Sequence, residues 1–139
     1  MIGRNLKNYE TYLDKIKAYA KASELKIVRK TEPSDGSYNP HNSTIVIDPD
    51  LDESTEIATL LHELGHAFDY KLDSSPSTWD AYHKVYTAEG PTPLQLEKVI
   101  EAEIRAWENG AMIAKRLKIP LGKWYAAERK VALTNYRKV

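Results

Sequence analysis

The chain has 139 residues, a length that suits one domain, covering residues 1–139, with its own hydrophobic core. With 42% hydrophobic and 29% charged residues and a formal net charge of zero, it is typical of globular proteins, and disordered and fibrous classes are excluded. The absence of cysteine excludes disulfides and thiolate ligands. No segment has the roughly 18 apolar residues of a membrane span or the apolar run of a signal peptide, so we expect a cytoplasmic protein without a membrane partner.

The neutral total hides an uneven distribution of charge. Residues 1–47 carry eight basic and five acidic side chains, residues 48–114 carry four and fourteen, and residues 115–139 carry eight and one. The acidic middle favours a bound cation. The basic end is explained by a solvated helix face that pairs with the acidic middle, and no helix-turn-helix signature accompanies it. We therefore expect no nucleic-acid partner.

The first third of the chain predicts one helix and a small sheet. Apolar residues recur three and four apart over about residues 5–22, as on the buried face of an amphipathic helix. Short strands of β-branched and aromatic residues are expected at 26–30, 37–39 and 44–47, with turn residues between them. A sheet of about three strands follows.

The next stretch is His62-Glu63-Leu64-Gly65-His66, inside a helix expected from Glu56 to Tyr70 and capped by Asp52 or Ser54. Residues four apart on a helix point the same way, so the two histidines direct their imidazoles to one point, with the glutamate beside them. This pattern predicts a zinc ion with a general base. The central glycine costs about 1 kcal/mol relative to alanine, and it indicates either a close neighbour or a tolerated glycine.

The remaining chain is predicted to be helical. A loop at 73–77 precedes a short helix at 78–87, and a break at 89–93 precedes a long helix at 94–117 and a last helix at 123–136. The last helix is expected to carry on one face Trp124, Ala127, Val131 and Asn135. The predicted class is α+β, with an N-terminal helix, a small sheet, the metal-binding helix and C-terminal helices.

Catalytic zinc usually takes three protein ligands and leaves a fourth position open, so one ligand is missing. An extended HExxHxxGxxH motif would need a ligand ten residues after His62, where the chain has Leu72, and that class is excluded. The other histidines, His41 and His83, are expected at the surface.

Glu101 and Glu103 are better candidates for the third ligand. They are two residues apart on the helix at 94–117 and about 200° apart around it, so only one can face the core. Glu103 has apolar neighbours at helical spacing, whereas Glu101 has charged ones. A carboxylate on an apolar stripe is unfavourable unless it is paired or bound to metal, so we expect Glu103 to be the ligand.

Two alternatives stay open. Glu103 can instead be a buried carboxylate satisfied by hydrogen bonds from a tyrosine or tryptophan. Asp69 can be the third ligand, or it can accept a hydrogen bond from a histidine ring and so fix its tautomer.

The motif His62-Glu63-Leu64-Gly65-His66, with Glu103 on a later helix, resembles the gluzincin metallopeptidases. The nearest forms that it suggests are ImmA/IrrE-type peptidases and the catalytic domain of lethal-factor-type toxins, and the resemblance covers about residues 38–117. It implies a minimal zincin-like domain that hydrolyses peptide bonds. It also implies that the strand Thr44–Ile47 pairs with an extended substrate.

The residues then imply a mechanism. Zinc on His62, His66 and Glu103 would lower the pKa of its water to about 7, and Glu63 would take the proton and pass it to the leaving amine. The sequence does not select a donor for the oxyanion. The candidates are Tyr82, His83, Tyr86, Tyr125 and Tyr136. We predict a zinc peptidase acting on peptides or proteins; the alternative is a catalytically weak or inactive zincin-fold protein that serves as a regulatory, protein-binding module.

Overall fold

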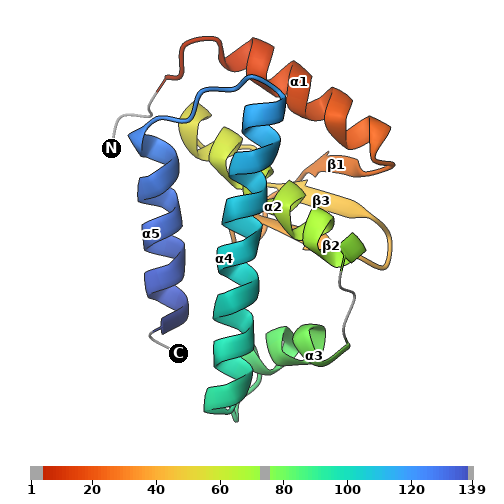
Figure 1. Cartoon of the computed structure of the whole chain (residues 1–139), viewed down its shortest axis with the longest axis vertical. Coiled ribbons are helices and arrows are strands. Elements are labelled where there is room, and N and C mark those ends of the chain that lie inside the picture. Colours follow the sequence, from red (N-terminus) through yellow and green to blue (C-terminus); the bar gives the residue numbers. More distant parts are fainter. Residues whose placement is uncertain (1–4, 73–75, 138–139) are drawn as a thin grey trace.

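The computed structural model describes residues 5–72 and 76–137. Five helices and a three-stranded mixed sheet within this part of the chain confirm the α+β class (Figure 1). No helix in it is long and apolar enough to cross a membrane. The elements are α1 (Tyr9–Ala22), β1 (Lys26–Arg29), β2 (Gly36–Asn39), β3 (Thr44–Ile47), α2 (Glu53–Leu72), α3 (Pro76–Val85), α4 (Pro93–Arg116) and α5 (Lys123–Arg137).

The sheet has the order β1-β3-β2, with β1 parallel and β2 antiparallel to β3. The central strand β3 buries Ile45 and Ile47 completely, as its β-branched sequence predicts. Both of its hydrogen-bonding edges are occupied by neighbouring strands, so the expectation that Thr44–Ile47 pairs with a substrate is wrong. The edge strand on the antiparallel side is β2.

The motif helix α2 begins at Glu53, directly after one of its two predicted caps. Asp52 precedes it, and its Oδ1 accepts the backbone N–H of Thr55 at 2.8 Å, which identifies Asp52 as the N-cap. Ser54, the other predicted cap, is buried inside the first turn. The cap fixes the start of the helix, whose middle, at the motif, packs against α4.

Two glycines set the distance between α2 and α4. A Cβ atom added to Gly65 would lie 1.9 Å from the backbone oxygen of Ala106, and one added to Gly110 would lie 2.6 Å from the oxygen of Leu61. Neither position has room for a side chain. The close-neighbour interpretation of Gly65 is therefore confirmed, and the crossing brings the motif against the middle of α4.

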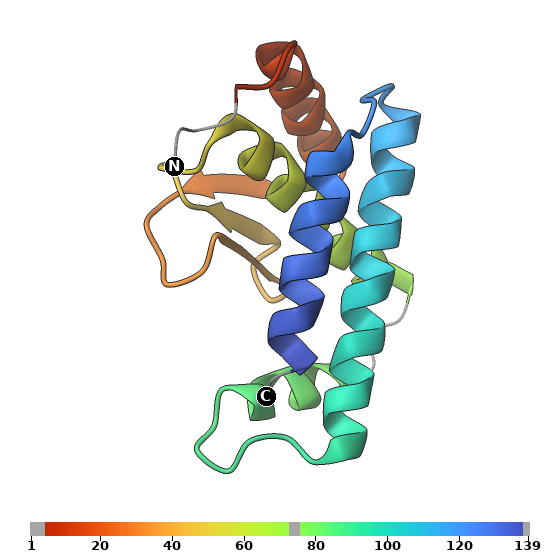
Figure 2. The same cartoon turned by 90° about the vertical axis from the view of Figure 1, so that its left-hand side faces the viewer.

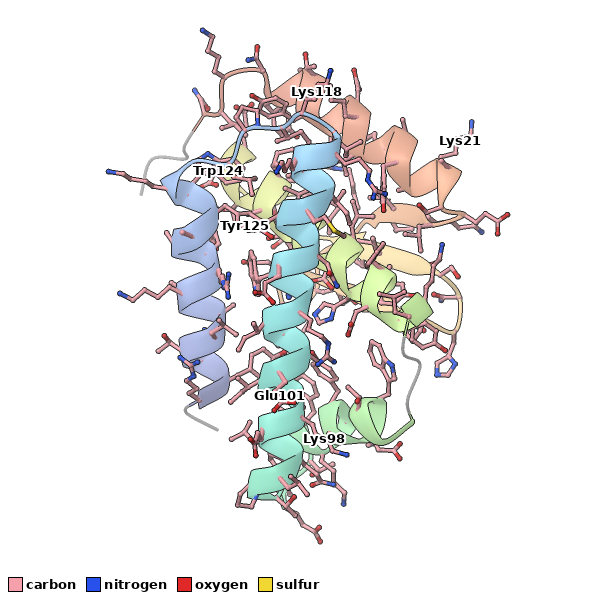
Figure 3. The ribbon with its side chains drawn as sticks, viewed as in Figure 1. Lys21, Lys98, Glu101, Lys118, Trp124 and Tyr125 are labelled. Carbon is pink, nitrogen blue, oxygen red and sulfur yellow. The ribbon has the colours of Figure 1, made fainter. Side chains whose placement is uncertain are left out.

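Helix α3 starts at Pro76, where the sequence predicted a loop over 73–77; residues 73–75 lie outside the described part of the chain. Helix α5 runs beside α4 (Figure 2), and its buried residues are Tyr125 and Leu133. The predicted face is wrong, since Val131 is 59% exposed. Tyr125 explains which face of α5 is buried. Its side chain points toward α4 (Figure 3), and its hydroxyl donates a hydrogen bond to the backbone oxygen of Trp107 at 2.6 Å.

Candidate metal centre

Helix α2 brings the three polar residues of the motif together. His62, Glu63 and His66 each present one ligand-type atom, and these atoms lie within 4.8 Å of one another. The two imidazole rings are 4.5 Å apart between centroids, as residues one helical turn apart should be. Both Glu63 and His66 are buried, with 5% and 8% of their surface exposed. The motif therefore forms a polar cluster shielded from bulk water.

Helix α4 adds Glu103 to this cluster. Its side chain is 1% exposed, and its two carboxylate oxygens lie 3.1 Å from His62 Nε2 and 2.6 Å from His66 Nε2. Glu101, two residues earlier, is exposed (Figure 3). The apolar stripe thus correctly indicated which glutamate faces the core. Two imidazole nitrogens and a carboxylate that meet at one place are a donor set that fits catalytic zinc.

The cluster is strongly charged. Burial alone would raise the pKa of Glu103, but the charges and hydrogen bonds of His66 and His62 hold it well below its usual range. Burial opposes the charged form of His62, yet the charge of Glu63 and the hydrogen bonds that the imidazole donates to Glu103 and Glu63 raise its pKa to about 10. A cation is therefore favoured between these carboxylates, and a metal ion can replace the imidazole proton in that role.

Tyr82, from α3, completes the surroundings of Glu103. Its hydroxyl donates to Glu103 Oε2 at 2.7 Å, and burial together with the Glu103 charge raises its pKa far above the ordinary value, so the hydroxyl stays protonated. This hydrogen bond is the kind expected if Glu103 is a buried carboxylate satisfied by a tyrosine and not a metal ligand. It does not account for the two imidazoles on the same carboxylate.

The candidate oxyanion donors separate in the structure. Tyr82, Tyr86 and Tyr136 line one cavity of about 300 Å³ together with the motif residues. The hydroxyl of Tyr125 is used in the bond to the α4 backbone, and His83 is exposed outside this cavity. Because Tyr82 already serves Glu103, the hydroxyls of Tyr86 and Tyr136 are the better candidates.

Asp69 takes neither of the roles considered for it. Its two carboxylate oxygens accept from Arg105 Nε at 3.0 Å and from Arg105 Nη2 at 3.2 Å. A bidentate pair of this kind fixes both side chains. Asp69 thus joins α2 to α4 beyond the histidines, and it does not reach the metal cluster.

The sequence did not assign a role to Trp107. Its indole stacks on the imidazole of His62 with ring centroids 4.3 Å apart and an angle of 11°. The contact restricts the rotation of the ring and so holds its nitrogens toward Glu103 and Glu63. The available signal was spacing, since Trp107 follows Glu103 by one helical turn. His41 is exposed, as predicted, and lies outside the cluster.

Comparisons with family models, curated proteins and solved structures found no match to this chain. Its function therefore has to be inferred from the chemistry of the cluster.

Proposed function

We propose that this chain is a gluzincin-type zinc peptidase that acts on peptide or protein substrates in the cytoplasm, with His62, His66 and Glu103 as metal ligands and Glu63 as general base. The observation that carries the proposal is the convergence of both imidazoles on one buried carboxylate from another helix. Within residues 5–72 and 76–137, the motif is the only cluster of potential ligands with such spacing.

Each residue of the site has a part in this chemistry. His62, His66 and Glu103 would hold the zinc, which would supply Lewis-acid chemistry: polarisation of the carbonyl and a lowered pKa, about 7, for the attacking water. Glu63 faces the same cavity, accepts the proton of the attacking water and delivers it to the leaving nitrogen. Tyr86 and Tyr136 offer hydroxyls to the carbonyl oxygen as its negative charge grows.

The edge strand β2 supports a peptide as substrate. Gly36, Ser37 and Tyr38 of this strand line the cavity that contains Glu63. An extended peptide can pair with a free strand edge through main-chain hydrogen bonds, which leaves its side chains to select the sequence. This role replaces the one expected of β3.

One observation favours the alternative of a regulatory module that does not hydrolyse peptides. Glu63 Oε2 lies 3.1 Å from His62 Nδ1, a contact that would let the carboxylate orient a metal ligand without acting as a base. In that case Glu63→Gln would weaken zinc binding by about 10- to 100-fold.

The test is a peptide-library cleavage screen with zinc, run on the wild-type protein and on Glu63→Gln. The wild type should cleave, and the variant should keep stoichiometric zinc while its rate falls by about 100-fold or more. Elemental analysis of the purified proteins measures the metal. Undiminished cleavage by the variant would remove Glu63 as the base, and a wild type without zinc would refute the metal site.

A further inference from the structure

An aromatic cavity of about 590 Å³ adjoins the metal centre. Its walls come from three parts of the chain: strand β2, the end of α2, and α3 with the residue after it. The aromatic residues that line it are Tyr38, Tyr70, Trp79, Tyr82 and Tyr86. Four of these five, all but Tyr70, also line the cavity of the metal centre, so the two spaces form one cleft.

Three of the rings form a corner. Tyr38, Tyr70 and Trp79 are inclined to one another by 63° to 68°, with centroids between 5.4 and 6.4 Å apart. Rings at these angles present a combination of faces and edges to the space that they line. The face of an aromatic ring carries negative potential and attracts ammonium and guanidinium groups.

The charged side chains that line the cleft also favour a cationic ligand. Within residues 5–72 and 76–137, Asp80 is the acidic residue that lines the aromatic cavity, and a third cavity, which shares His62, Glu63 and Glu103 with the metal centre, adds Asp35 and Glu128. Among the residues that the structure describes, no lysine or arginine lines any of the three. Zinc would offset the charges of Glu63 and Glu103 and leave the outer carboxylates for the substrate.

We propose that the aromatic cavity binds the cationic side chain of an arginine or lysine residue in the peptide substrate. That the ligand is a peptide rests on the proposed function. The preference for a cationic side chain comes from the aromatic rings and from Asp80, and it does not depend on hydrolysis. An arginine suits the space best, because its planar guanidinium stacks on rings while it pairs with a carboxylate. A large aromatic side chain would gain burial but would make no favourable interaction with the negative charge of Asp80.

Binding to Glu63→Gln, with zinc present, tests the cavity without cleavage. An arginine is moved through each position of an alanine hexapeptide, and each peptide is paired with one that carries citrulline, the neutral isostere of arginine, at the same position. Calorimetry at pH 8 gives the affinities. At one position arginine should bind about tenfold more tightly than citrulline.

Changes in the cavity should remove this discrimination. Two variants test this: Asp80→Asn, which changes an exposed residue, and Trp79→Leu. Each should bring the ratio of arginine to citrulline affinity close to one. The matched control Asp14→Asn, on the exposed face of α1, should leave the ratio unchanged. Equal affinities at every position, or a ratio that neither cavity variant reduces, would overturn the proposal.

Failure of this proposal can be distinguished from failure of the proposed function. Selective binding of arginine peptides without cleavage by the wild type would refute the peptidase and leave the cation site standing. Cleavage of library peptides without preference for arginine or lysine in the binding assay would refute the cation site alone.

Discussion

Two buried glutamates, one on α2 and one packed against it, each accept a hydrogen bond from a tyrosine but have cationic partners of different kinds. Glu56, near the start of the helix, is 3% exposed and accepts the hydroxyl of Tyr9 at 2.5 Å. Glu103, which reaches the middle of the helix from α4, is 1% exposed and accepts the hydroxyl of Tyr82 at 2.7 Å. The cationic partner of Glu56 is Arg29, whereas Glu103 is held by two imidazoles.

The kind of cation decides what each cluster can do. Arginine remains protonated at all ordinary pH values and has no lone pair for a metal, so the Glu56 cluster cannot take up a metal ion, and we call it the closed cluster. It joins α1, β1 and α2. An imidazole can exchange its proton for a metal ion. A buried carboxylate therefore indicates a functional site only when its partners can be exchanged, as at Glu103.

The largest effect expected from this difference concerns zinc affinity. Glu103→Ala should weaken zinc binding by about 1,000-fold, beyond the roughly 10- to 100-fold effect of partners that only orient ligands. Glu56→Gln and the exposed Glu101→Ala should leave the affinity unchanged. Competition with a chromogenic chelator measures all three proteins. If Glu101→Ala lowers the affinity as much as Glu103→Ala does, the assignment of the third ligand is wrong.

The second prediction concerns the helix crossing on which the Glu103 cluster depends. Gly65→Ala places a methyl group against the backbone oxygen of Ala106, which cannot move without the helix, and should lower the free energy of unfolding by about 3 kcal/mol. The control is Gly90→Ala, where nothing lies within 4 Å and only the positive φ of 72° opposes the change, at about 1 kcal/mol. Urea denaturation gives both values. Equal losses would show that the crossing is looser than described.

The part of the site that lies on helices was predictable because helical spacing is local. His62 and His66 are four residues apart, and the apolar neighbours of Glu103 lie at three, four and seven residues. These relations hold wherever the helices pack. The burial of Glu103 was therefore expected from the chain itself, whereas the close approach at Gly65 was one of two interpretations that the sequence left open.

The rest depends on packing between distant segments. Tyr82 comes from α3 and Tyr136 from α5, and no spacing shows which tyrosine meets Glu103. The pairing of Asp69 with Arg105 spans 36 residues. The position of β3 in the centre of the sheet follows from the pairing of the strands, which three short segments do not reveal.

The third prediction measures the stability of the closed cluster. Glu56→Gln removes the charge that Arg29 and Tyr9 share and should lower the free energy of unfolding by about 1–3 kcal/mol. Zinc at 100 times its dissociation constant should raise the stability of wild type and Glu56→Gln equally, by about 2.7 kcal/mol, and should not stabilise Glu103→Ala. Thermal unfolding with and without zinc tests this. A smaller zinc effect in Glu56→Gln would mean that the two clusters are coupled.

The smallest effect is the alkaline loss of stability at the closed cluster. Burial and the hydrogen bond to Glu56 raise the pKa of Tyr9 to about 12, so the folded protein holds this proton more tightly than the unfolded chain, whose tyrosine pKa is about 10. The resulting stability is present below pH 10 and is lost as the pH rises from 10 to 12; because Tyr9 is only partly buried, solvent screening reduces the loss at pH 11 to about 0.5–1 kcal/mol. Tyr9→Phe has no proton to lose there, so its stability should fall less between pH 9 and 11, as urea denaturation at each pH would show. Identical pH slopes for wild type and Tyr9→Phe would contradict the raised pKa of Tyr9, and with it the burial and the hydrogen bond of its hydroxyl.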